Sequence, residues 1–336
     1  MKVFVAPLFK LFISLLLIAI QTLLADEEWE LKRTNFYFEN DIYSGTDEDY
    51  TAGMRLSFLY SIEDDKEYPL YELLFLDYGL HDSYFTAALT NQIFTPIDTN
   101  NSDVVADERP YASWSYLEFG MHKSYTNHLL SMLLQVGAVG EISGGEWLQK
   151  AAHDLVGNNS PNGWDNQLNN ELGVNFKGTH KWMVRSKKFT KYECALVPFM
   201  SLELGNIAIR TTLGTSARFG YNIPKDFGLS SIDIGADPGI ASYNNYLKKS
   251  RNRLCYSLNL NLAGSYVIRD IFLDGNTFSK SHSVEKEPFV YYYGVGLSFR
   301  YGDIALDIMH TYNSKKYKLE NHGHGVDTLT LSWFYY

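Results

Sequence analysis

The 336-residue sequence predicts an all-β fold, a transmembrane antiparallel β-barrel of about 12 strands with one short helix. Segments of about ten residues that alternate between apolar and mixed polar positions are the signature of strands in such a barrel. Aromatic residues make up 15% of the chain, which suits the girdles that barrels place at both membrane interfaces. An N-terminal apolar run typical of an export signal is the third observation.

The N-terminus has the features of a secretory signal peptide. Two lysines are the only charged residues before Asp26, and residues 11–20 are almost entirely apolar. We therefore predict a signal peptide over residues 1–25 and one outer-membrane β-barrel domain over residues 26–336. The alternative is an uncleaved anchor, for which the apolar run is short.

Composition excludes several classes of protein. The chain has 29 basic and 39 acidic residues, a net charge of −10, whereas nucleic-acid binders usually carry a basic excess. The mean hydropathy of −0.22 argues against a bundle of membrane helices, each of which needs roughly 20 apolar residues. Two cysteines exclude a disulfide-dense scaffold.

Period-two alternation along the chain defines the predicted strands. The clearest segments are 51–60, 128–140, 254–268, 289–301, 302–312 and the aromatic C-terminal run 328–336. Three polar stretches are predicted to be surface loops, namely 95–110, 177–191 and 278–288. The alternative to a membrane barrel is a β-sandwich, whose polar faces would point outward into water.

Residues 145–157 break this pattern and predict a short amphipathic helix. Glu146, Gln149 and His153 fall on one helical face, and Trp147 and Leu148 fall on the other. We expect this helix to lie inside the barrel with its polar face toward a site. The plainer interpretation of His153 is an exposed helix histidine.

A second polar cluster lies near the start of the predicted domain. A strand ends at Asn40 and Asp41, and Thr51 follows shortly after. Their side-chain oxygens would suit a hard cation such as calcium, although the spacing is not that of an EF-hand. The alternative is an acidic hairpin tip exposed to solvent.

Together and in order, several strings of the sequence resemble the outer-membrane lipid A 3′-O-deacylase family, over residues 35–175 or so. The matching strings are Glu39-Asn40-Asp41, Tyr50-Thr51-Ala52-Gly53, Arg109-Pro110-Tyr111-Ala112, Gly145-Glu146 with Gln149 and His153, and Gly163-Trp164-Asp165-Asn166-Gln167-Leu168. The resemblance implies a 12-stranded barrel whose active site lies in the wall near the outer leaflet. It also implies an ester hydrolase that removes the 3′-linked acyloxyacyl group of lipid A.

The resemblance further implies roles for individual residues. His153 would be the general base with Gln149 beside it, and Asn40, Asp41 and Thr51 would hold or orient a calcium ion. The implied partners are the outer membrane and its lipid A or lipopolysaccharide, with no nucleic acid, and we expect a monomer. A histidine suits the role of a base because its charge changes near neutral pH, and calcium would stabilise the developing oxyanion.

The chain departs from the family pattern at two positions. The family has a lysine in the loop before the Arg109 equivalent, whereas no lysine occurs between Lys66 and Lys123. The family also has a glutamate six residues after the histidine, where this chain has Asn159. Arg109 is therefore the candidate for the missing positive charge, and Glu146 is a further candidate substrate contact.

Other catalytic mechanisms have less support in the sequence. No Gly-x-Ser-x-Gly string is present, and Cys194 and Cys255 lie far from the motifs in sequence, so serine and thiol nucleophiles have no support. The remaining alternatives are a non-catalytic porin or structural barrel, and an outer-membrane phospholipase.

Overall fold

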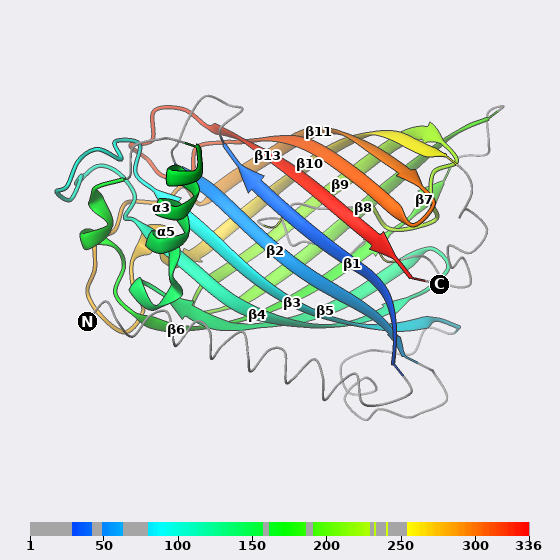
Figure 1. Ribbon diagram of the computed structural model, residues 1–336, viewed down its shortest axis with the longest axis horizontal. Helices are drawn as coiled ribbons and strands as arrows, with labels where there is room; N and C mark the ends of the chain where they lie inside the picture. The colour runs from blue at the N-terminus through cyan, green and yellow to red at the C-terminus, as the bar shows by residue number, and fades with distance from the viewer. Residues whose placement is uncertain are drawn as a thin grey trace.

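The structure is a computed structural model that describes residues 29–41, 49–62, 80–156, 161–185, 191–228, 232, 240 and 254–335. The predicted signal peptide and Asn159 lie outside these residues, so both predictions stay untested. Most of the described chain forms one antiparallel sheet (Figure 1). Among these residues, no helix is long and apolar enough to cross a bilayer.

Twelve long strands and one two-residue strand make up the sheet. In chain order they are β1 (Trp29–Asn40), β2 (Asp49–Ile62), β3 (Asp82–Thr95), β4 (Ala112–Ser124), β5 (His128–Val139), β6 (Glu171–Trp182), β7 (Val184–Arg185), β8 (Tyr192–Gly205), β9 (Ala208–Tyr221), β10 (Cys255–Asp270), β11 (Phe289–Tyr301), β12 (Ile304–Asn313) and β13 (His324–Phe334). The helical segments are η2 (Glu141–Ser143), α3 (Gly145–Val156), η3 (Gly163–Asn166) and α5 (Ile271–Asp274).

The sheet closes into a barrel. Each long strand pairs with its neighbour in sequence, β1 pairs with β13, and β6 pairs with β8 past the short β7. The predicted 12-stranded antiparallel barrel is therefore confirmed, and closure leaves no long unpaired edge. The predicted strands correspond to β2, β5, β10, β11, β12 and β13, and the predicted helix to α3.

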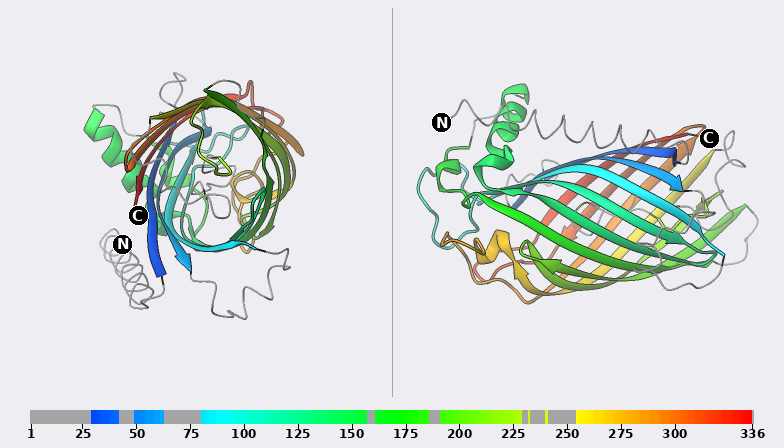
Figure 2. Two further views of the ribbon diagram at one scale, coloured as in Figure 1. Left: turned by 90° about the vertical axis from the view of Figure 1, so that its right-hand side faces the viewer. Right: turned by 90° about the horizontal axis from the view of Figure 1, so that it is seen from below.

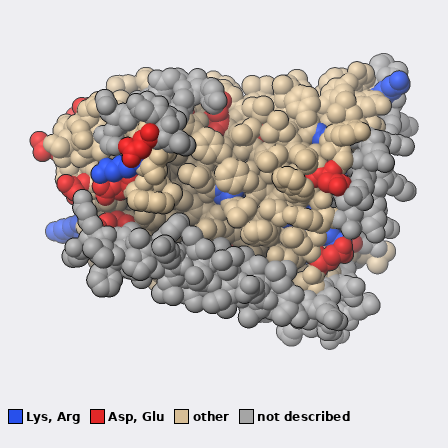
Figure 3. Space-filling model, in the orientation of Figure 1, with Lys and Arg blue, Asp and Glu red and all other residues tan. Residues whose placement is uncertain are grey.

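The strands alternate between an apolar outer face and a polar lumen. On β11 the exposed side chains are Phe289, Tyr291, Tyr293, Val295, Leu297, Phe299 and Tyr301. In Figure 3 few charged atoms show between the two ends of the wall. Buried ion pairs line the lumen instead, with Arg55 2.7 Å from Glu118 and Lys177 2.8 Å from Glu203. This is the pattern of a barrel whose outer face meets lipid.

One predicted loop is wrong. Residues 177–191 were expected on the surface, but β6 continues to Trp182, and Lys177 points into the lumen. The charge of Lys177 is tolerated there because Glu203, on the neighbouring β8, is within salt-bridge distance. A lysine in a strand therefore has the same sequence pattern as a lysine in a loop when its partner is distant in sequence.

The barrel has two distinct ends. β1 begins and β13 ends at one of them, which we call the terminal rim. At the other end, the helix rim, α3 and α5 lie in the connections after β5 and β10 (Figures 1 and 2).

Apolar side chains fill the lumen near both rims. Near the helix rim, Phe272 of α5 stacks on Phe94 of β3 with ring centroids 4.1 Å apart, within a cluster that also includes Val326 of β13. Near the terminal rim a second cluster joins β2 to the nearly opposite β8, through Leu59 and Val197. A lumenal cavity lined by Phe94, Phe272 and other side chains has a volume of about 50 Å³, enough for only a few water molecules.

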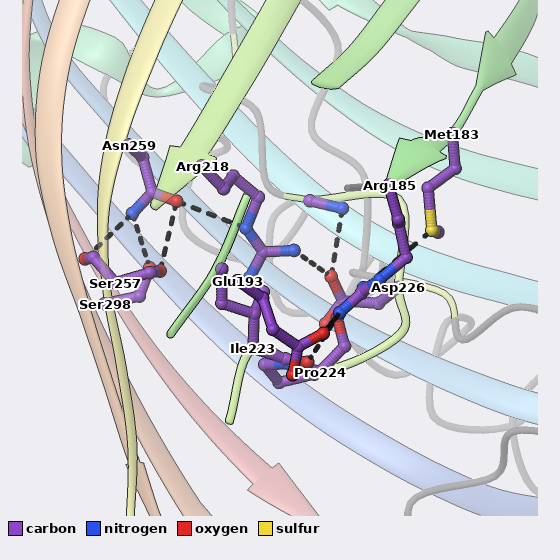
Figure 4. Close-up of polar contacts among 11 residues, drawn as sticks. Met183, Arg185, Glu193, Arg218, Ile223, Pro224, Asp226, Ser257, Asn259 and Ser298 are labelled. Carbon is purple, nitrogen blue, oxygen red and sulfur yellow. Dashed lines mark hydrogen bonds and ion pairs between the residues drawn. The ribbon is translucent and has the colours of Figure 1, made fainter. Parts of the chain in front are cut away.

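The connection after β9 contributes to the filling at the terminal rim, where two arginines hold residues 222–228 (Figure 4). Arg185 donates to the carbonyl oxygens of Ile223 and Pro224, at 3.2 and 3.1 Å. Arg218 pairs with Asp226, which also accepts from the backbone N–H of Gly228. Phe227, between these anchors, is only 1% exposed and packs in the second apolar cluster.

Candidate active site on the outer face of the wall

Helix α3 lies outside the barrel, against strands β3 and β4 (Figure 2). The expectation of a helix inside the barrel is therefore wrong. The lumen at this rim is already occupied by Phe272, Phe94 and Trp114, so α3 packs on the other side of the wall. Any site that α3 builds faces the lipid side of the barrel.

A glycine allows α3 to begin directly on the wall. A Cβ on Gly145 would collide with Cβ and Oγ of Ser113 on β4. The preceding Gly144 adopts a left-handed conformation, φ 77°, which glycine adopts without steric strain. Just before it, the carbonyl oxygen of Ser143 accepts a hydrogen bond of 2.7 Å from Ser115 Oγ. These contacts fix the first turn of α3 to β4.

The buried and exposed faces of α3 differ from the sequence expectation. Leu148 and Gln149 face the wall, whereas Trp147 is 62% exposed. The reason is a small apolar cluster on the outer face, formed by Ile93, Tyr111 and Trp164, against which Leu148 packs. The wall-facing side of α3 is therefore mixed, and it carries a buried amide.

That amide is held by an indole. Trp164 of η3 donates from Nε1 to Oε1 of Gln149 at 2.8 Å, and its ring packs on Tyr111 with centroids 5.2 Å apart. A Cβ on Gly163 would collide with the Tyr111 ring, so glycine is required at that approach. Three of the motifs noted in the sequence, around Arg109, Gly145 and Gly163, thus meet on the outer face of β3 and β4.

The second polar cluster lies on the same outer face, at the helix-rim ends of β1, β2 and β3. Asn40 donates from Nδ2 to the backbone oxygen of Thr51 at 2.9 Å. A register shift in β2 at Thr51 turns its hydroxyl toward Thr95 of β3, and the two Oγ1 atoms are 2.7 Å apart. Thr95 was missed in the sequence, because its pairing with Thr51 depends on a bulge that no local pattern signals.

The carboxylates that flank Asn40 are both fully buried. Glu39 points into the lumen, where Tyr50, Thr328 and the backbone N–H of Ile232 all donate to it. Asp41 follows Asn40 and is likewise 0% exposed. Of the residues assigned to the metal site, the structure thus brings Asn40 and Thr51 into contact and buries Asp41 beside Asn40.

His153 lies one turn beyond Gln149 on α3 and is half-buried. Residues four apart on a helix share a face, so the imidazole and the buried amide are on one side of α3. Beyond Lys150, Ala151, Ala152 and Asp154 are exposed. Up to Asp154, α3 therefore leaves the imidazole more open than the amide.

Of the two candidate substrate contacts, one lies on the other side of the wall and one lies on α3 itself. Arg109 is buried, with its guanidinium 4.7 Å from the centroid of Phe94, and it lines the lumenal cavity. Its charge therefore lies on the inner side of the wall. Glu146, on α3, forms an ion pair of 2.6 Å with Lys150, one turn along the same helix.

A family model described as outer membrane protein LpxR matches residues 11–335 of the chain. The chain belongs to the LpxR family. This confirms the resemblance drawn from the motifs, and it identifies an outer-membrane β-barrel protein. No curated protein sequence matches the chain.

One solved structure supports the barrel fold. LpxR from Salmonella typhimurium has a TM-score of 0.72 at 17% identity, with 90% of this chain and 100% of that chain covered. At that identity the match supports the shared fold of an LpxR-type barrel. The beta domain of the Bordetella autotransporter BrkA has a TM-score of 0.48 at 9% identity, covering 91% and 99%, and the KdgM porin has 0.35 at 8%, covering 90% and 99%.

Proposed function

We propose that this LpxR-family protein is a lipid A 3′-O-deacylase, which hydrolyses the 3′-linked acyloxyacyl ester with His153 as the general base. The observation that carries the proposal is the position of α3. Gln149 and His153 share a face of a helix that packs on the outer side of the wall, the same side as Asn40 and Thr51. An ester of a membrane lipid reaches that side directly from the bilayer.

The family and the arrangement of the site support the orientation that this function needs. The start of β1 and the end of β13 lie at the terminal rim, whereas the connections that carry α3 and α5 lie at the helix rim. Outer-membrane barrels usually place most of their longer loops outside the cell, and more of the long connections lie at the helix rim than at the terminal rim, although the connection after β9 is at the terminal rim. With the helix rim outward, α3 lies beside the outer leaflet, where lipid A resides.

In the proposed reaction, a ring nitrogen of His153 takes a proton from a water molecule, and that water attacks the ester carbonyl carbon. The same imidazolium then gives the proton to the departing sugar oxygen. Each transfer needs the imidazole within about 3 Å of the oxygen concerned. The described residues offer no serine or cysteine next to His153 in α3, so the attack is assigned to water rather than to a covalent nucleophile.

Calcium remains part of the proposal. Among the described residues there is no group of three His, Cys, Asp or Glu side chains that could hold a metal. The donors at hand are the amide oxygen of Asn40, the buried carboxylate of Asp41 and the hydroxyl of Thr51, all hard oxygens of the kind calcium prefers. A bound calcium would stabilise negative charge that develops on the ester oxygen.

The filled lumen weighs against a passive porin. Apolar clusters span the described lumen near both rims, and a cavity beside the helix-rim cluster has a volume of about 50 Å³. A porin of this strand number would need an open aqueous path through the same space. The phospholipase alternative shares the outward site and differs in the lipid that occupies it.

The test is lipid mass spectrometry of cells that express the protein. We expect loss of the 3′ acyl chains from lipid A with wild type, and intact lipid A with His153→Ala. The matched control is His322→Ala, an exposed loop histidine outside the site, which should retain activity. Heat-modifiable migration checks that each variant is a folded barrel.

Two outcomes would contradict the proposal. A folded His153→Ala barrel with full deacylation would remove His153 as the base. Shortened phospholipids alongside intact lipid A, in the same wild-type extract, would favour the phospholipase.

A further inference from the structure

The indole of Trp164 makes an unusual contact for a tryptophan on the outside of a barrel. It is only 2% exposed, and its single polar atom, Nε1, donates to Oε1 of Gln149 at 2.8 Å. Its ring is fixed by Tyr111 and by the start of α3, where Gly145 leaves room for it. The donor is therefore held rigidly by packing.

This contact selects one orientation of the Gln149 amide. An indole N–H can donate but cannot accept, so only the oxygen end of a side-chain amide can face it. The NH₂ end must then point the other way. Rotating the amide by 180° would set its NH₂ group against the indole N–H, leaving both donors without an acceptor.

The NH₂ end of the Gln149 side chain indicates where a ligand could bind. Gln149 is 3% exposed, and its Nε2 has no hydrogen-bond partner among the described residues. Leaving a buried donor unsatisfied costs about 1–3 kcal/mol, so native proteins rarely keep one without a reason. A carbonyl oxygen of a substrate would satisfy it.

Resting on the proposed deacylation, we propose that Trp164 is a positioning residue, which aims the Nε2 donor of Gln149 at the ester carbonyl oxygen. The donor strengthens its hydrogen bond as negative charge develops on that oxygen. His153, on the same face of α3, lies where the attacking water is activated. Trp164 touches neither substrate nor water and acts only through Gln149.

A double-mutant cycle on the full-length protein, with purified lipid A as substrate, tests this role. Trp164→Phe keeps an aromatic ring but removes the N–H, and we expect kcat to fall about tenfold with KM little changed, as loss of one oriented hydrogen bond predicts. In a Gln149→Ala background the same Trp164→Phe change should have almost no further effect on kcat. Trp147→Phe, the same change at an exposed position of α3, should retain wild-type activity.

A purely structural role for Trp164 gives a different pattern. Trp164→Phe would then lower kcat by the same factor with or without Gln149, and that additivity would overturn the proposal. Unchanged kcat in folded Trp164→Phe would overturn it as well. A folded wild-type protein that leaves lipid A intact would refute the proposed function, and this inference with it.

Discussion

The contact between Gly145 and the wall makes a sharp prediction for Gly145→Ala. The new methyl group would collide with Ser113 Cβ, an atom fixed by the backbone of β4, so the clash cannot be relieved by a side-chain rotation. Restoring ordinary van der Waals separation requires the start of α3 to retreat by on the order of 1 Å. A displacement of that size in catalytic groups can reduce the rate by about 100-fold.

We expect Gly145→Ala to lower kcat for lipid A deacylation by roughly 10- to 100-fold, the upper value being the loss that a displacement of this size can cause. The thermal unfolding midpoint of the barrel should change little, because α3 packs outside the closed sheet. The measurements are turnover by mass spectrometry and heat-modifiable migration against temperature. Gly264→Ala is the matched control, since the nearest atom to its new Cβ would be 3.8 Å away.

A second substitution tests the cause directly. Ser113→Gly removes the two nearest of the three atoms that the new methyl group would meet and leaves only the Trp164 ring, at 3.2 Å, so it should restore much of the activity in the Gly145→Ala background. Full activity of Gly145→Ala alone would refute the claim that α3 must sit this close to the wall. Failure of Ser113→Gly to rescue it would show that the loss has another cause.

Two further predictions concern the cation and the lumen. Excess chelator should abolish deacylation, added calcium should restore it, and Asp41→Asn should raise the calcium concentration needed for half-maximal activity; full activity in chelator would remove calcium from the mechanism. In planar bilayers the wild-type barrel should show no steady conductance, while Asp226→Ala, which removes the carboxylate partner of Arg218, should produce openings. Asp303→Ala, in the β11–β12 turn at the same rim, is the control, and a steady wild-type current would contradict the filled lumen.

The barrel was predictable because its signal is local. Outward and lumenal positions alternate along each strand, so Met54, Leu56 and Phe58 were enough to identify β2. The limits of α3 were equally clear, because glycines stand at Gly145 and just past Val156. Where the pattern failed, at Lys177, the burial depended on Glu203 from another strand.

The side of the wall on which α3 packs was not predictable. An amphipathic helix shows only that it has two faces, and both lumen and outer wall offered a surface to cover. The side on which α3 packs is decided by the space left in the lumen. Phe272 of α5, more than 100 positions further along the chain, stacks on Phe94 there. The hydrogen bond between Trp164 and Gln149 was likewise not predictable, because nothing in the local sequence around either residue indicates which way a side-chain donor points.

A site on the outer face of the wall also explains why the wall carries polar side chains there, which would be unfavourable in contact with lipid. On the outer face, Asn91 donates to both Ser113 and Ser115, a group of polar side chains where a barrel normally presents apolar ones to lipid. Polar groups in that position are costly unless they are covered and hydrogen-bonded. The segment that begins α3 supplies the cover, through the Ser143 carbonyl on Ser115 and Gly145 on Ser113. The polar patch and the helix are thus one unit: the patch anchors α3, and α3 then holds Gln149 and His153 on the lipid side of the wall, as the proposed hydrolysis of a lipid ester requires.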